Sequence, residues 1–290
     1  MKNACFYNYF LLLLSISIVS LSSSASSEDV LIYIQSDVYA DYQNFVKNRD
    51  ILTIHDFSGE SSTRDVVDMV IANQALKLGG FTHKITFASG NVNFRNTKML
   101  QSGKLLMSFD TYWSNDAERL KDKIYKSQPV IRKGEYIAGI YTSPYNKKVL
   151  QLRSKDDFKE LTAISTSKWS TDWQTLQSLS LKKLINEDSW LSMARMVNIQ
   201  WIDFMLMPFN SNPDHSFIQD KIHLVPVKNM AIVLNDSRHF VISKAHPLGK
   251  EAFIATEKGL TILRSQGTIS RAYTEAGFFI DRNQYKVLNQ

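Results

Sequence analysis

Four consecutive residues combine a carboxylate, a hydroxyl and two aromatic rings: Asp110, Thr111, Tyr112 and Trp113. They follow an apolar run at 105–109 that has the length of a buried strand. Ligands of open α/β sheets bind at the carboxyl ends of strands, and aromatic walls with a few polar groups suit a small solute. This segment is therefore the first candidate ligand loop, and an ordinary loop with packed aromatic residues is the alternative.

A second group of this kind follows a predicted strand at 162–165. Trp169, Ser170 and Thr171 stand at the start of a predicted helix. Backbone N–H groups and the helix dipole attract anions to such a start, so it could hold an anionic group of a solute. The alternative is that Ser170 or Thr171 only caps the helix.

A hydrolase would need a serine with a base within hydrogen-bond reach and an oxyanion site. Ser58, with His55 close in sequence, is the candidate. The nucleophile-elbow motif needs glycine on both sides of the serine at fixed offsets, and Asp56 fills the first of these positions. We therefore predict that Ser58 contacts a ligand and that the chain is not an enzyme. The histidines show no paired metal spacing, so no metal or other cofactor is expected.

The first residues are typical of an export leader. Lys2 precedes an apolar run at 10–21 and small residues at 22–26, and we expect cleavage after Ala25. A run of this length is too short for a membrane span, which needs roughly 20 residues. Cys5, the single cysteine, precedes the run, so the mature chain would contain neither a disulfide nor a reactive thiol.

The formal charge of +6 is spread along the chain, and acidic residues interrupt its densest basic group. A nucleic-acid-binding protein would show a basic stripe with stacking aromatic residues, so no nucleic-acid partner is expected. The residues that remain after cleavage suffice for one large domain or two smaller lobes.

Hydrophobic periodicity predicts alternating strands and helices, with a second such repeat from residue 135. Thr63 is expected to cap a helix that ends at the glycine pair 79–80. The other predicted strands lie at 30–34, 51–55, 84–88, 105–109, 135–142, 162–165, 181–185, 201–206, 222–227, 231–234 and 240–243. The other predicted helices lie at 93–102, 116–125, 156–161, 171–179, 188–196, 247–266 and 269–276.

The order of these segments resembles the type II periplasmic binding proteins, and more narrowly the extracellular solute-binding proteins of amino-acid-type ABC importers. The residues that carry the resemblance are the loop 110–113, Arg119, the Ser-Gln-Pro run at 127–129, the helix start at 169, Asp203 after a helix and at a strand, and the two C-terminal helices at 253–276. Thr111 and Arg119 are eight residues apart, whereas the family often has Thr-x-x-Arg.

The resemblance implies an α/β fold of two lobes, each a mixed sheet flanked by helices, joined by a two-strand hinge. After the signal peptide at 1–25, the first lobe would comprise 26–132 and 237–290, and the second lobe 133–236.

The resemblance also implies a ligand cleft between the lobes. The expected ligand-binding residues are Ser58, Asp110, Thr111, Tyr112, Trp113, Arg119, Trp169, Ser170, Thr171 and Asp203. Asp203 would favour a ligand ammonium and Arg119 a carboxylate. The alternative for Asp203 is a structural bond to a backbone turn.

The function that the resemblance implies is capture of a small, polar, amino-acid-like solute in the periplasm by a monomer that serves an ABC importer. A ligand-binding module that regulates a membrane sensor is the alternative, and a secreted hydrolase is a third. The partners would be the solute and a membrane permease or sensor protein.

Overall fold

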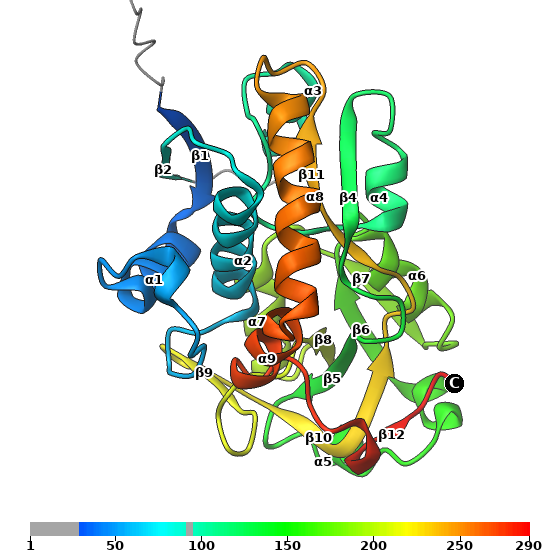
Figure 1. The fold of residues 1–290 in the computed structure, drawn as a ribbon. Coiled ribbons are helices and arrows are strands. Elements are labelled where there is room, and N and C mark those ends of the chain that lie inside the picture. Colours follow the sequence, from blue (N-terminus) through cyan, green and yellow to red (C-terminus); the bar gives the residue numbers. More distant parts are fainter. Residues whose placement is uncertain (1–28, 91–94) are drawn as a thin grey trace, which may run out of the picture.

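The computed structural model of the chain describes residues 29–90 and 95–290. The expected leader at 1–25, Cys5 and the first residues of the predicted helix 93–102 lie outside this part. The described chain forms two lobes, each with a hydrophobic core of its own (Figure 1). None of the helices in the described ranges is both long and apolar enough to cross a membrane.

The first lobe begins with a parallel strand pair. β1 (Val30–Gln35) pairs with β2 (Ile85–Gly90), and α1 (Ser36–Val46) and α2 (Arg64–Gly79) lie between them in sequence. The predicted strand at 51–55 is wrong, because residues 51–53 form a 3-10 turn, η1 (Ile51–Thr53), that the Asp50 side chain caps.

An antiparallel sheet completes the first lobe. β11 (Arg238–Ser243) lies between β3 (Tyr112–Trp113) and β4 (Ile124–Ile131). α3 (Arg95–Gln101) precedes β3, and α4 (Ser114–Glu118) follows it directly. The predicted strand at 105–109 contributes only one bridge, between Met107 and Ile242, and the predicted helix at 116–125 stops at Glu118. At 116–125 the pairing of Ile124 and Tyr125 with β11 prevails over the local helical pattern.

Two long helices pack face to face over this lobe. α2 lies beside α8 (Gly249–Ser265), which α9 (Thr268–Glu275) follows (Figure 1). The contact is tight, because a Cβ atom on Gly259 would lie 1.9 Å from the carbonyl oxygen of Ala75. All residues of α2 from Val66 to Leu76 are buried, which requires cover on more than one side.

The second lobe is built on the long strand β10 (Ile222–Val233). β10 pairs with β5 (Ile137–Thr142), β9 (Phe217–Gln219) and β12 (Lys286–Val287), and β8 (Met205–Met207) continues the sheet beyond β5. A separate parallel pair joins β6 (Thr162–Ser165) to β7 (Lys183–Asn186).

The remaining short helices mostly surround these strands. They are α5 (Lys147–Leu150), η2 (Lys155–Glu160), α6 (Ser170–Gln177), α7 (Trp190–Asn198) and η3 (Arg282–Gln284). Neither Ser170 nor Thr171 caps α6, because its N-cap residue is Trp169, whose side chain makes no capping hydrogen bond.

Two chain segments cross between the lobes. One runs from the end of β4 into β5 and the other from the end of β10 into β11. They are hydrogen-bonded to each other, since the backbone N–H of Leu234 donates to the carbonyl of Tyr136 at 3.0 Å. The chain beyond residue 279 packs against the second lobe, where β12 pairs with β10 and Leu288 joins the core. The boundary predicted from the sequence placed all of 237–290 in the first lobe.

Candidate functional site

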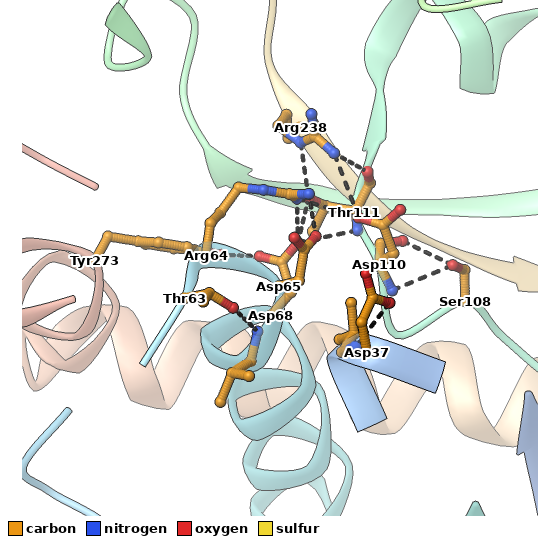
Figure 2. Close-up of polar contacts among 12 residues, drawn as sticks. Asp37, Thr63, Arg64, Asp65, Asp68, Ser108, Asp110, Thr111, Arg238 and Tyr273 are labelled. Atoms are coloured by element: carbon orange, nitrogen blue, oxygen red, sulfur yellow. Dashed lines mark hydrogen bonds and ion pairs between the residues drawn. The ribbon is translucent and has the colours of Figure 1, made fainter. Parts of the chain in front are cut away.

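The first turn of α2 places three charged side chains at one edge of the first lobe. The Thr63 hydroxyl accepts a hydrogen bond from the backbone N–H of Val66 at 3.4 Å, so the helix begins at Arg64. Side chains four residues apart share a helix face, and Arg64 Nη1 lies 2.7 Å from Asp68 Oδ2. The other terminal nitrogen of Arg64 is paired with Asp65 (Figure 2).

The carboxylate of Asp68 is completely buried and joins three segments of the chain. Its Oδ2 atom accepts hydrogen bonds from the Thr111 backbone N–H at 3.1 Å and from the Thr111 hydroxyl at 2.8 Å. Its Oδ1 atom accepts from the Tyr273 hydroxyl of α9 (Figure 2). Burial, followed by the negative charge of Asp68, raises the pKa of Tyr273 well above its usual range, so the phenol stays a donor.

A second arginine enters the same site from the start of β11. Arg238 Nε donates to the Thr111 hydroxyl at 2.8 Å, and Arg238 Nη2 lies 3.5 Å from Asp110 Oδ1. Arg64 reaches the same oxygen of Asp110 at 3.1 Å (Figure 2). The Arg238 guanidinium also lies over the ring of Trp113, 4.7 Å from its centroid, which is a cation–π geometry.

Three hydrogen bonds connect this edge of the first lobe, and the crossing segment between β10 and β11, to the N-terminus of α6 in the second lobe. The Trp113 indole N–H donates to Asp172 Oδ2 at 3.0 Å. Ser170 Oγ donates to Asp116 Oδ1 at 2.5 Å. Thr171 Oγ1 donates to Asp236 Oδ2 at 3.2 Å. The two lobes therefore touch directly, through side chains that come from both.

Tyr136, in one of the two crossing segments, forms the inner wall of the site. Its ring is stacked on Trp113, with centroids 5.5 Å apart and an interplanar angle of 18°, and packs against Phe278 on α9's C-terminal side. The residue is 5% exposed. The aromatic rings thus fix Trp113 beside the hinge, where its indole N–H faces the second lobe.

The carboxylates of the site are not equivalent electrostatically. Burial, reinforced by the negative charges of Asp110 and Asp68, raises the pKa of Asp65 to about 6 although Arg64 opposes the shift. Burial likewise raises the pKa of Asp172 to about 6, against the opposing effects of Arg238 and the Trp113 hydrogen bond. Both carboxylates are thus ionised at neutral pH at a free-energy cost to the folded state.

The raised pKa of Asp172 predicts a pH-dependent gain in stability for Asp172→Asn. The folded-state pKa of Asp172 is about 6, above the unfolded value of about 3.8. The contribution of Asp172 to the free energy of unfolding therefore falls as the pH rises from about 4 to 6, and it stays low above that range. We expect the variant to melt at a higher temperature than the wild type at pH 7.5, and the gap to shrink at pH 4.5. Thermal melts of both proteins between these values check this, and a gap that does not change with pH would contradict it.

The structure brings together five of the predicted ligand-binding residues. Asp110, Thr111 and Trp113 belong to the charged site, and Ser170 and Thr171 face it across the lobes. Their hydroxyls are bonded to protein carboxylates, so a ligand role for them stays a prediction.

Other predicted residues point elsewhere. Tyr112 alternates with Trp113 along β3, and its hydroxyl is bonded to Thr97 at 3.0 Å. Arg119 has a side chain that is 63% exposed and pairs with Asp116 at 3.5 Å. The Trp169 ring packs against the core of the second lobe.

Asp203 is tied to the structure of the second lobe. Its Oδ2 atom accepts hydrogen bonds from the Thr162 backbone N–H at 2.7 Å and the Thr162 hydroxyl at 2.9 Å, and Asn146 donates to Oδ1 at 3.3 Å. Thr162 begins β6, whereas Trp169 and α6 follow the end of that strand. These bonds fit the structural alternative for Asp203, and a ligand role for this residue stays a prediction.

Ser58 lies outside the charged site. Its hydroxyl is exposed and donates to Asp56 Oδ1 at 2.6 Å, and the neighbouring Phe57 backbone N–H is bonded to Glu275. A carboxylate that accepts a hydrogen bond from the serine hydroxyl, with no histidine between the two, is not the serine and histidine arrangement of a hydrolase.

Sequence reasoning missed most of the charged residues at this site. Arg64, Asp65, Asp68, Asp116, Tyr136, Asp172, Asp236, Arg238 and Tyr273 were not candidates. One signal was available for the first three, because a helix whose other positions are mostly apolar begins with an arginine and two aspartates at spacings that share a face. The hinge residues carry no such local signal, since only the fold brings them to the site.

Three carboxylates of the site have the arrangement of a cation-binding cluster. Oxygen atoms of Asp65, Asp68 and Asp110 lie within 4.8 Å of one another. The Arg64 guanidinium contacts all three carboxylates. This position thus already holds a positive charge supplied by the chain, so the cluster does not indicate a metal site.

Solved structures with the same fold are known, although no protein-family model and no curated protein matches the chain. A probable amino-acid ABC transporter extracellular-binding protein, YtmK from Bacillus subtilis, matches with a TM-score of 0.57 at 14% identity, over 86% of this chain and 97% of that one. The periplasmic VFT2 domain of BvgS from Bordetella pertussis matches with a TM-score of 0.57 at 13% identity, over 86% and 93% of the two chains.

An amino-acid ABC transporter substrate-binding protein from Streptococcus pneumoniae, bound to L-arginine, matches with a TM-score of 0.53 at 13% identity, over 87% and 95% of the two chains. An ancestral amino-acid-binding protein described as a precursor of cyclohexadienyl dehydratase matches with the same TM-score at 14% identity, over 86% and 95%. At these identities the matches establish the fold, and the predicted two-lobed, type II periplasmic-binding-protein architecture is confirmed.

Proposed function

We propose that the protein binds a small, polar, amino-acid-like solute between its lobes and presents the closed complex to a membrane partner. The observation that carries the proposal is the meeting of two polar edges beside the hinge, where Trp113 of the first lobe is bonded to Asp172 of the second. A solute held there would contact both lobes, so binding would couple to their relative position.

The solved structures of the same fold support this proposal by analogy. Two of them are described as amino-acid ABC transporter binding proteins. Because one fold can host many functions, the support for solute binding comes mainly from the site. In this proposal the protein works outside the cytoplasm after removal of residues 1–25, as a monomer, with a permease as its partner.

One observation favours regulation of a membrane sensor as a second candidate. Side chains of the two lobes already bond to each other, through Trp113 to Asp172 and Ser170 to Asp116. A module whose lobes meet through their own side chains can pass a change in lobe position to an attached partner, and one matching structure is a periplasmic domain of BvgS.

A thermal-shift screen of the mature chain tests the solute-binding proposal. Amino acids, dipeptides and small organic anions form the panel, and a solute that binds only the folded state should raise its melting temperature. At a hundredfold excess over its Kd, a ligand adds about 2.7 kcal/mol to the free energy of unfolding. A panel in which no compound raises the melting temperature at millimolar concentration would contradict the proposal.

A further inference from the structure

A second cavity lies inside the first lobe, apart from the site between the lobes. Its volume is about 410 Å³, within the range of small-molecule sites, which is about 300–1,000 Å³. It is enclosed by α1, η1, α2 and the chain from Phe81 into β2, and α1, α2 and β2 are grouped on the left of the view in Figure 1. The residues that line it all lie between Tyr42 and Phe87, so a ligand there would need no contact with the second lobe.

The cavity and the site between the lobes lie at different positions along α2. Arg64 of the first turn belongs to the site between the lobes, whereas Asn73 and Leu76 line the cavity. A helix rises about 1.5 Å per residue, so Asn73 stands about 14 Å farther along the helix axis than Arg64. In β2 the lining residue Ile85 is the first of the strand, at the end opposite to the carboxyl end where open α/β sheets bind ligands.

The inner walls of the cavity are mostly apolar and partly aromatic. Leu76 and Phe81 are buried there. The Phe87 ring packs edge-on against the Tyr42 ring, with centroids 5.2 Å apart. Phe87 and Ile85 are two residues apart on β2 and therefore share a face of the strand. These walls suit an aromatic ring, which packs on other rings in offset or edge-on geometry.

Buried hydrogen bonds hold these walls together. Gln74 Nε2 donates to the carbonyls of Ile51 and Ile54 at 2.8 and 2.9 Å, which fixes η1 against α2. Asn73 Nδ2 donates to the Tyr42 hydroxyl at 3.2 Å, which joins α2 to α1. The cavity is thus enclosed by elements that are bonded to one another.

One polar atom of the wall lacks a partner. His83 lines the cavity, and its Nδ1 atom is buried without a hydrogen-bond partner among the residues that the structure describes. Its other ring nitrogen, Nε2, lies 3.7 Å from Glu251 Oε2. In the neutral ring this carboxylate favours the proton on Nε2, which leaves Nδ1 as an acceptor. Buried polar atoms are ordinarily hydrogen-bonded, so Nδ1 marks a position for a donor group of a ligand.

The rim of the cavity carries an excess of positive charge. Arg49, Lys77 and Lys84 are exposed there, and Asp50 is the one carboxylate among the lining residues. Asp50 pairs with Lys77 at 3.5 Å, and Lys84 pairs with Asp29, outside the cavity, at 3.1 Å. Arg49 forms no ion pair within the described part of the chain, and its guanidinium donates only to backbone carbonyls of α1. An anionic group is therefore favoured at the rim.

We propose that this cavity binds a small aromatic carboxylate with a hydroxyl or N–H group on its ring. The ring lies against Leu76 and Phe87, its polar hydrogen goes to His83 Nδ1, and its carboxylate meets the cations of the rim in charge-assisted hydrogen bonds. A cationic ligand of the same shape would meet like charges at the rim. An apolar ligand would leave His83 Nδ1 buried without a partner, which is unfavourable. The inference goes beyond the proposed function, because neither the hinge nor the second lobe contributes to the cavity.

The test compares three matched probes on the wild-type protein by isothermal titration calorimetry. We expect 4-hydroxyphenylacetate to bind with a submillimolar Kd. Tyramine has the same ring with an ammonium in place of the carboxylate and should bind about tenfold or more weakly. Phenylacetate lacks the hydroxyl and should bind severalfold more weakly. Small-angle X-ray scattering should give the same radius of gyration with and without 4-hydroxyphenylacetate, because the ligand contacts one lobe alone.

Variants then locate the ligand. Thr82 is an exposed lining residue, so Thr82→Trp should fill the mouth of the cavity and weaken 4-hydroxyphenylacetate about tenfold or more. Arg49→Gln should weaken it by a similar factor, whereas Arg49→Lys keeps a cation and should retain most of the affinity. Lys147→Gln is the matched control, because Lys147 is exposed on α5 of the second lobe, and it should leave binding unchanged. Circular dichroism melts confirm that each variant is folded.

Three results would overturn the inference. One is a failure of 4-hydroxyphenylacetate to bind at millimolar concentration, and another is binding of tyramine that is equally tight. The third is binding elsewhere, shown by undiminished affinity of Thr82→Trp and Arg49→Gln or by a smaller radius of gyration in the complex. None of these results decides whether a solute binds between the lobes, which the thermal-shift screen tests separately.

Discussion

Arg64→Met is expected to destabilise the protein by about 3–5 kcal/mol, because it removes one partner of a buried ion pair. The Arg64 side chain is 14% exposed, and the Asp68 carboxylate with which it pairs is completely buried. Without the guanidinium, Asp68 keeps its charge in a low-dielectric site, and Asp65 and Asp110 repel it more strongly. Urea denaturation at pH 7.5 measures the loss.

Arg119→Met is the matched control for this change. It removes the same functional group, but the Arg119 side chain is 63% exposed and its ion pair with Asp116 spans 3.5 Å. Exposed pairs contribute about 0–1 kcal/mol, so the control should stay near the wild type. The double variant Arg64→Met/Asp68→Asn should recover part of the loss, since it removes the uncompensated charge. Equal losses for Arg64→Met and Arg119→Met would contradict the buried network.

Trp113→Ala is expected to lower the free energy of unfolding by about 3–5 kcal/mol, as large-to-small changes at buried aromatic residues do. Trp113 is buried between Arg238 and Tyr136 and also supplies the indole N–H to Asp172. The substitution removes the ring on which both neighbours pack and the hydrogen bond that this residue makes to the second lobe. Urea denaturation gives the stability, and small-angle X-ray scattering gives the separation of the lobes.

Two further variants separate packing from the contact between lobes. Trp113→Phe keeps an aromatic ring but removes the indole donor, so it should cost only about 1–3 kcal/mol while Asp172 loses its partner. Trp201→Ala removes an indole that is 74% exposed, and its effect should be within about 0.5 kcal/mol. A loss for Trp201→Ala as large as that for Trp113→Ala would refute the packing role of Trp113.

The elements that the sequence predicted well are those with local signals. α2 has a threonine cap, an apolar repeat and a glycine terminator, and the structure places its ends at Arg64 and Gly79, with Gly80 in the left-handed region at φ 97°. β1, β6 and β7 are apolar runs between turn residues and were also predicted. Such elements form largely because of residues within or beside them.

The elements that were predicted wrongly depend on distant partners. Residues 105–109 read as a strand, but only Met107 forms a bridge, to Ile242, on the edge of β11 that also pairs with β3. Residues 119–125 read as a helix, yet β11 offers a ladder to Ile124 and Tyr125. β11 lies more than a hundred residues from either segment, so the sequence around these segments does not indicate that β11 is their partner.

The residues of the candidate site also differ in whether a local signal indicates them. The carboxyl-end rule led to Asp110, Thr111 and Trp113 through the predicted strand at 105–109, although this segment forms only one bridge in the structure. The bonds between Asp203 and Thr162 carry no local signal, because Thr162 lies 41 residues earlier and is beside Asp203 only in the folded second lobe. Arg238 and Tyr136 reach the site through the two crossing segments, and their positions follow from the hinge rather than from any motif.

The pairing of α2 with α8 determines the order in which a growing chain can fold. Every strand from β5 to β10 is synthesised before α8, so the second lobe has its main sheet while α2 still lacks its partner. At roughly 5–20 residues per second, α2 waits on the order of ten seconds. During synthesis its buried residues, Val66 to Leu76, thus form an apolar surface open to holding chaperones until α8 has been made.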